Sequence, residues 1–234
     1  MPELTLPEDA RHYLLLQRTE YQSGVLGSLF RKLRLRGVYD RYLLPYFDRN
    51  SLDDLSEKYA TDLRAEYETM RPHLPATVDS ILDIGCGLGG IDVYLDRHYD
   101  RTPRLSLLDR DTVSDIYYRY EQTAAAYNSL ALTEKLARVN GIDADRLRTV
   151  DVDEAGYPRD ETFDLIVSLL SWGYHYPLET YLDDVTETLA PGGTVILDVR
   201  KRTDGRATLS EAFDSLSVVE ETGKRARIAA RSPA

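Results

Sequence analysis

The sequence has a single cysteine, no long apolar run and comparatively few basic residues. With Cys86 alone, no disulfide can form within the chain. The longest apolar runs extend over only a few residues, which is too short to cross a membrane. The 29 Lys and Arg residues face 40 Asp and Glu residues, which gives a net charge of −11. A chain this acidic repels phosphates, so its composition disfavours nucleic acid as a partner.

The N-terminal residues are acidic, whereas a secretory signal peptide begins with basic ones. We therefore expect a cytoplasmic protein without a membrane span. The 234 residues suffice for one α/β domain with an added segment, and a hydrophobic content of 42% supports a packed core. Nothing in the composition indicates an oligomeric state.

The pattern of apolar residues changes at about residue 76. Before it, helical patterns extend over residues 8–22, 24–47 and 51–74, and no convincing strand is present. We predict that residues 1–75 form an N-terminal helical cap that carries substrate specificity. Residues 76–234 then form the main domain.

Short apolar runs alternate with helical stretches in residues 76–234. The runs predict strands at 80–84, 104–109, 146–152, 163–170 and 193–199. Continuous apolar strands separated by helices are typical of a parallel sheet that is covered on both faces. The last two runs, 217–221 and 225–231, flank Gly223 and predict a β-hairpin. The expected fold is α/β, with a Rossmann-like, doubly wound sheet of seven strands whose last strand is antiparallel.

A glycine cluster follows the first predicted strand in the stretch ILDIGCGLGG, residues 81–90. Gly85, Gly87 and Gly90 fit the dinucleotide fingerprint, in which glycines permit a tight turn and backbone amides face an anionic group. Asp83 stands where that fingerprint usually has an apolar or small residue. A carboxylate there would repel the pyrophosphate of NAD and attract the ammonium group of S-adenosylmethionine. The loop therefore favours the second cofactor.

Asp109 ends the second predicted strand. An acid at this place accepts hydrogen bonds from the ribose hydroxyls of either cofactor, so it indicates an adenosine without identifying it. Three further features follow, namely an acidic patch at 151–154, FDLIVS in the fourth strand and a Pro-Gly-Gly turn in LAPGGTVIL. With the terminal hairpin, this order resembles the class I S-adenosylmethionine-dependent methyltransferase family over residues 76–231. More loosely, LLSWGYHYPLETYL resembles sugar O-methyltransferases.

The resemblance implies a cofactor site at the carboxyl ends of the first four strands. It assigns to S-adenosylmethionine the residues Asp83, Gly85, Cys86, Gly87, Gly89, Asp109, Arg110, Asp151, Val152, Asp153 and Ser168. The acid on the adenine side is either Asp151, which the strand end favours, or Asp153, which the spacing to the fourth strand favours. Cys86 suits a small apolar filler better than a nucleophile.

The stretch SLLSWGYHYP, residues 168–177, falls beyond the carboxyl end of the fourth strand, where ligands of open α/β sheets bind. His175 is the candidate general base for a hydroxyl acceptor, and a structural role for this histidine is the alternative. Trp172, Tyr174 and Tyr176 are candidates for a wall against the acceptor, although at least one of them is expected in the core.

Asp198 and Lys201 follow the fifth predicted strand and could reach an acceptor or a metal ion. Metal-dependent members of the family need several clustered acids, and no such cluster can be assembled from the sequence. We therefore expect no metal.

These observations predict an enzyme, a methyltransferase that acts on a small molecule, with a hydroxyl of a sugar or secondary metabolite as the first candidate acceptor. Protein or RNA methylation, NAD-dependent oxidation and cofactor binding without transfer are the alternatives. An oxidoreductase would need a Tyr-x-x-x-Lys or comparable arrangement, which we do not find. The basic run at 30–36 could meet an anionic acceptor, and the tyrosine-rich stretch at 112–128 could form a lid.

Overall fold

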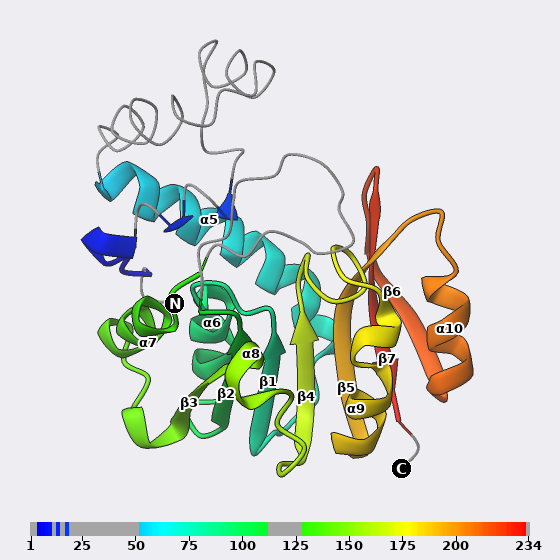
Figure 1. Ribbon diagram of the computed structural model, residues 1–234. Helices are drawn as coiled ribbons and strands as arrows, with labels where there is room; N and C mark the ends of the chain where they lie inside the picture. The colour runs from blue at the N-terminus through cyan, green and yellow to red at the C-terminus, as the bar shows by residue number, and fades with distance from the viewer. Residues whose placement is uncertain (1–3, 11–12, 15–16, 19–51, 112–127, 233–234) are drawn as a thin grey trace.

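A single sheet of seven strands organises the chain, in the order β3-β2-β1-β4-β5-β7-β6 (Figure 1). The computed structural model describes residues 4–10, 13–14, 17–18, 52–111 and 128–232. The strands are β1 (Ser80–Ile84), β2 (Arg104–Asp109), β3 (Leu147–Asp151), β4 (Phe163–Ser168), β5 (Leu189–Arg200), β6 (Ser215–Glu221) and β7 (Arg225–Arg231). Strands β1 to β5 pair in parallel, and β7 runs antiparallel to both β5 and β6. The predicted α/β sheet with an antiparallel last strand is confirmed.

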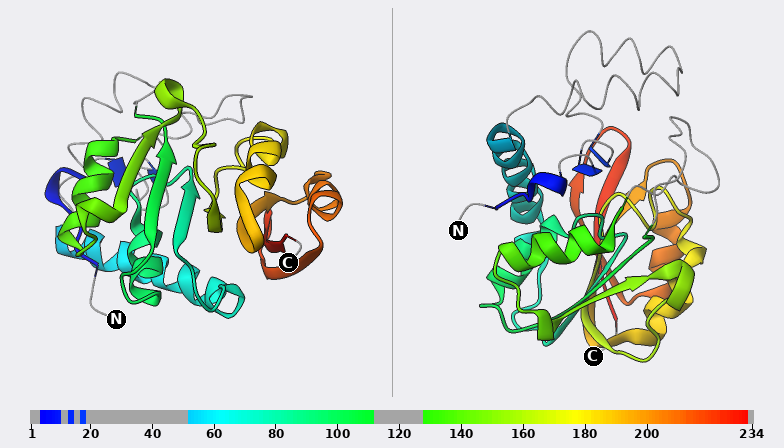
Figure 2. Two further views of the ribbon diagram at one scale, coloured as in Figure 1. Left: turned by 90° about the horizontal axis from the view of Figure 1, so that it is seen from below. Right: turned by 60° about the vertical axis from the view of Figure 1, so that its left-hand side comes forward.

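Helices cover both faces of the sheet (Figure 2). They are α5 (Leu52–Met70), α6 (Gly90–His98), α7 (Leu130–Val139), α8 (Val152–Ala155), α9 (Leu182–Thr188) and α10 (Gly205–Ala212), with 3-10 turns η1 (Glu8–Ala10), η4 (Arg71–His73), η5 (Ala144–Arg146) and η6 (Leu178–Thr180). Neighbouring residues of a strand point to opposite faces. Thus Ile81 joins the core beneath α5, α6 and α7, while Leu82 joins a second core with α9 and α10. This layering leaves the carboxyl ends of the parallel strands free for a site.

Helix α5 packs in the same core as α6 and α7. Its apolar side chains Leu55, Tyr59, Leu63 and Met70 share the core of α6 and α7. The Tyr94 hydroxyl of α6 also donates to the carbonyl of Ala60, at 2.8 Å. The division at residue 76 is therefore not marked by a gap in packing, and a specificity role for residues 1–75 stays a prediction.

Several other predictions from the sequence fall partly or wholly outside the described residues. These are the helices over 8–22 and 24–47, the basic run at 30–36 and the tyrosine-rich stretch at 112–128. Among the residues that are described, no helix combines the length and the apolar character that a membrane crossing requires.

Four strands, β3 to β6, differ from the predicted bounds at one or both ends, and three of these differences have a local cause. Strand β3 stops at Asp151 because that side chain accepts from the Asp153 amide and starts α8. Strand β4 stops at Ser168, shortly before Leu170 turns the chain with a φ of 58°. Strand β5 begins early, at Leu189, because the Pro-Gly-Gly turn is an irregularity within its pairing to β4 rather than a loop before it.

Candidate functional site

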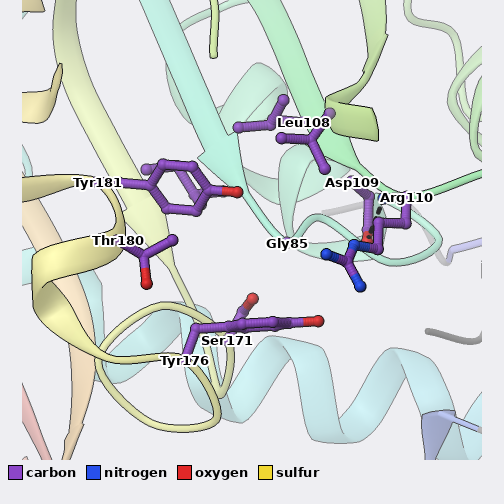
Figure 3. Close-up of a pocket in the computed structure, with 10 residues that line it drawn as sticks. Gly85, Leu108, Asp109, Arg110, Ser171, Tyr176, Thr180 and Tyr181 are labelled. Atoms are coloured by element: carbon purple, nitrogen blue, oxygen red, sulfur yellow. Dashed lines mark hydrogen bonds between the residues drawn. The ribbon is translucent and has the colours of Figure 1, made fainter. Parts of the chain in front are cut away.

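A hollow opens beside the glycine loop, at the carboxyl ends of β1 and β2 (Figure 3). It is lined by Ile84, Gly85, Leu108, Asp109, Arg110, Val152, Ser171, Tyr176, Thr180 and Tyr181. The space among them is about 410 Å³ and includes a part that is open to solvent. Figure 3 shows the Tyr181 ring facing the hollow from one side and Arg110 beside Asp109 on the other. An apolar slot with a few polar groups suits a planar ring attached to a polar moiety.

The glycine loop is folded tightly onto the end of β2. The amides of Gly85 and Cys86 both donate to the Leu108 carbonyl, at 2.7 and 3.2 Å. Gly85 has a φ of 77°, and a Cβ at this position would lie 2.0 Å from the Ser171 Oγ. Burial raises the pKa of the Cys86 thiol, which keeps it neutral and fits a filler rather than a nucleophile. Only glycine meets both the conformation and the close approach required at position 85.

The third glycine of the fingerprint has a packing role. Gly90 starts α6, and a Cβ there would lie 2.2 Å from the Tyr59 hydroxyl of α5. Gly89 precedes it with a φ of 72° and is the N-cap of the helix. The glycine loop therefore depends on α5 as well as on β1 and α6.

Asp109 holds the glycine loop and faces the hollow. Its Oδ2 accepts from the Gly87 amide at 2.7 Å, and its Oδ1 accepts from the Arg110 amide at 2.7 Å. Burial raises the pKa of this carboxyl, while the two amides favour its charged form. Each oxygen retains a lone pair, so the carboxylate can accept two more hydrogen bonds, as a ribose diol would supply.

A second carboxyl group, which sequence reasoning missed, lies beneath the loop. Asp92 of α6 is fully buried, and it lies within hydrogen-bonding reach of Asp83, which is only 2% exposed. Among the described residues, neither oxygen of Asp92 has a hydrogen-bond donor as partner. Burial and mutual repulsion raise the pKa of Asp83 well above its usual value, and burial raises that of Asp92 to about 7. The pair therefore holds a proton that two separate aspartates would release.

The aspartate pair predicts a pH-dependent stability. Because Asp92 binds a proton more tightly in the folded than in the unfolded chain, rising pH between about 4 and 7 should destabilise the fold. Asp92→Asn removes that titration, and its amide can donate to Asp83. We expect the wild type to lose up to about 1.4 kcal/mol per pH unit more than the variant across this range, measured by denaturant unfolding.

A neighbouring aspartate offers a matched control. Asp96 is also buried in α6, but it accepts from Arg146 at 2.9 Å. Asp96→Asn should therefore destabilise the chain at pH 5 and pH 8 alike, since Arg146 loses its charged partner. If Asp92→Asn behaves in the same way, the two carboxyl groups do not share a proton.

The acids after β3 lie at the rim rather than inside the hollow. Asp151 caps α8 by accepting from the Asp153 amide at 3.0 Å, and Asp153 pairs with Arg110 at 3.3 Å. Val152 between them lines the hollow directly, and the Arg110 guanidinium lies 6.0 Å from the ring centre of Tyr176. Which of the two acids meets an adenine amino group stays a prediction.

The loop after β4 places Ser171, not Ser168, against the glycine loop. Ser168 is fully buried, donates to the Ile84 carbonyl at 2.8 Å and accepts from the Trp172 amide at 2.9 Å. It joins two strand ends and is not among the residues that line the hollow, and its contact with the cofactor stays a prediction. Sequence reasoning missed Ser171 because its position depends on the backbone conformation of Leu170. No apolar pattern in the sequence reveals that conformation.

The aromatic residues of this loop take different positions. Trp172 is fully buried and donates to the Leu178 carbonyl at 2.8 Å, as expected for a core residue. Tyr176 lines the hollow, whereas Tyr174 lies outside it, with the Arg200 guanidinium 4.7 Å from its ring centre. The wall expected of three aromatic residues is therefore reduced to Tyr176, which Tyr181 joins.

His175 is exposed on the same loop and precedes Tyr176 in the chain, but it is not among the residues that line the hollow. Its ring meets the Tyr174 ring edge to face, with centroids 4.9 Å apart. Partial burial and the Arg200 cation lower the pKa of His175, so the ring is mostly neutral near pH 7 and can accept a proton. The role of His175 as a general base stays a prediction, and the neutral ring is compatible with it.

Asp198 is not available to an acceptor or a metal ion. It is fully buried and binds Arg225 and Arg227, while Lys201 pairs with Glu221 at 3.0 Å. In the part of the chain that the structure describes, no three His, Cys, Asp or Glu side chains are placed to hold a metal ion.

The strand order, the glycine loop and the acid at the end of β2 allow this fold to be compared with those of solved proteins. Solved structures of methyltransferases match this fold with TM-scores of 0.50 to 0.53. The chain has the fold of the class I S-adenosylmethionine-dependent methyltransferases. No family model matches the sequence, and no curated protein matches it.

Three solved structures illustrate the range of proteins that share this methyltransferase fold. The precorrin-6y C5,15-methyltransferase from Geobacter metallireducens GS-15 is 15% identical, with a TM-score of 0.51 over 74% of this chain and 89% of that one. StiE O-MT is 14% identical, with a TM-score of 0.53 over 83% and 81%. The T. Thermophilus 16S rRNA N2 methyltransferase, in complex with AdoMet and guanosine, is 18% identical, with a TM-score of 0.50 over 74% and 42%. These likenesses establish the fold, and they leave the acceptor open.

Proposed function

We propose that this chain is an S-adenosylmethionine-dependent methyltransferase that acts on a small-molecule acceptor, with a hydroxyl as the first candidate. The observation that carries the proposal is the placement of Asp109. Its carboxylate closes the glycine loop through the Gly87 amide and borders an apolar hollow. That combination suits the ribose and the adenine of one ligand.

The residues of the hollow fit the cofactor in three parts. Asp109 would accept from the ribose hydroxyls, and Leu108, Val152 and Tyr181 would contact the adenine ring. Asp83 is buried beneath the loop with a raised pKa, and a ligand ammonium would favour its charged form, whereas a pyrophosphate would not. When bound, S-adenosylmethionine supplies an electrophilic methyl group, so the protein's task is to orient the acceptor and to take up its proton.

The charge of the chain supports a small acceptor. A net charge of −11 disfavours a polyanion, and a neutral His175 beside the hollow suits a hydroxyl that must lose a proton. Methylation of protein or RNA is the alternative, and an RNA methyltransferase is among the proteins of similar fold. A sugar or secondary metabolite as the acceptor, and a cytoplasmic location, stay predictions.

Ligand-induced thermal stabilisation tests the proposal. S-adenosylmethionine or S-adenosylhomocysteine at 100 times its Kd should stabilise the purified protein by roughly 2.7 kcal/mol. NAD at the same concentration should have no effect, since the buried aspartates disfavour a pyrophosphate at this loop. A rise in Tm with NAD alone would remove the basis for methyl transfer.

A further inference from the structure

We propose that Asp198 is a positioning residue for the cofactor site, because it holds the loop after β4 in the conformation that lays Ser171 over Gly85. The inference rests on the function proposed above. It concerns a residue that does not touch the hollow and acts only through the backbone of Leu170.

The loop after β4 begins with an unfavourable backbone conformation. Leu170 has a φ of 58°, in the left-handed region that branched and bulky residues avoid. The conformation turns the chain so that Ser171 reaches the glycine loop, where a Cβ on Gly85 would lie 2.0 Å from its Oγ. Strained residues persist only where their surroundings hold them.

Asp198 supplies that restraint from the neighbouring strand. Its Oδ2 accepts from the Leu170 amide at 3.2 Å. Further along the loop, the amides of Tyr174, His175 and Tyr176 all donate to the Ser171 carbonyl, and the Arg200 amide of β5 donates to the Gly173 carbonyl at 3.1 Å. The bond to Asp198 is thus the contact that ties the strained residue itself to the sheet.

Buried arginines fix Asp198 in turn. Arg227 is fully buried and donates to both of its oxygens, at 2.8 Å from Nε and 3.0 Å from Nη2. Arg225 adds a contact at 3.1 Å. The same Nη2 of Arg227 also pairs with Glu66 of α5 at 3.3 Å. A carboxylate held by two guanidinium groups cannot rotate freely, so the direction in which it faces Leu170 is set by β7 and α5.

The two ends of this ion network provide a variant and its control. Asp198→Asn alters the end that holds Leu170, while Glu66→Gln alters the opposite end without touching the loop. Both variants weaken the same buried guanidinium, so both should lower the Tm. Only Asp198→Asn should raise the Kd for S-adenosylhomocysteine, by about tenfold or more, since a charged partner of a loop hydrogen bond is lost. Calorimetric titration well below both Tm values gives the comparison.

A rescue separates positioning from general destabilisation. Glycine adopts a positive φ without strain, so Leu170→Gly added to Asp198→Asn should recover much of the lost affinity without restoring the Tm. Leu170→Gly alone should leave the Kd within about twofold of wild type, because the position is not among those that line the hollow. Equal Kd values for the Asp198 and Glu66 variants, or no recovery in the double variant, would overturn the inference.

Hydrogen exchange and ligand binding by the wild type complete the test. If Asp198→Asn does not fold, hydrogen exchange in the wild type decides. The Leu170 amide should be protected to the same degree as its neighbours in β4, and rapid exchange there contradicts the restraint. Failure of the wild type itself to bind S-adenosylhomocysteine would count against the proposed function and not against the role of Asp198.

Discussion

Replacing His175 by alanine is expected to lower kcat about 10²–10⁴-fold if this ring takes the proton of a hydroxyl acceptor. The side chain is exposed beside the hollow and does not line it, so the Kd for S-adenosylhomocysteine should not change. The limb of the pH–rate profile below neutrality should also disappear. Because Arg200 and partial burial lower the pKa of His175, that limb should lie below the usual histidine value of about 6.5.

A second histidine serves as the control. His73 belongs to η4, forms a hydrogen bond with Ser217 at 3.2 Å and does not line the hollow. His73→Ala should leave kcat unchanged with any acceptor that the wild type methylates. If His175→Ala lowers the Tm and has little effect on kcat, the ring is structural, and an acceptor that is already nucleophilic, such as an amine, becomes the better candidate.

Asp109→Ala should raise the Kd for S-adenosylhomocysteine about 10- to 100-fold, because hydrogen bonds to a charged group contribute roughly 1.5–3 kcal/mol. The loss has two parts. The ribose loses its acceptor, and the Gly87 amide loses the bond that holds the glycine loop. Calorimetric titration measures the sum, and the exchange rate of the Gly87 amide measures the second part separately.

Asp111 provides a matched control two residues further along. It also accepts from a backbone amide, that of Leu130 at 3.0 Å. Leu130 is the first residue of α7, and Asp111 does not line the hollow. Asp111→Ala should therefore lower the Tm with little change in Kd. Similar Kd values for the two variants would show that the ribose is bound elsewhere.

The sequence predicts the fold where local signals and tertiary structure agree. Strands β1 and β2 begin and end at the predicted residues because each is a short apolar run that ends at a glycine loop or an acid. The Asp109 site follows from the same boundary, since a strand end fixes which residue faces the ligand. The hairpin of β6 and β7 was likewise evident from two runs around Gly223.

Other parts of the site depend on long-range contacts that no local pattern carries. Arg227 lies in β7 between Ala226 and Ile228, yet it is fully buried because Asp198 is its cross-strand partner. Asp92 sits in an apolar stretch of α6, but only the fold shows that it meets Asp83. Strand β4 appeared longer than it is, because a leucine at position 170 gives no hint of a positive φ.

The buried ion pair between Arg227 and Glu66 limits where this chain can be joined to another protein in a chimera. A shortened protein that begins at residue 76 would expose the core that α5 covers and would leave Arg227 without its carboxylate on that side. A segment grafted from another protein should therefore be joined upstream of α5, so that Glu66 and the helix stay with the sheet. The same core holds Leu4, Leu6, Ala10 and Leu14, so these residues should stay with the sheet as well, and the change of sequence pattern at residue 76 is not a suitable junction.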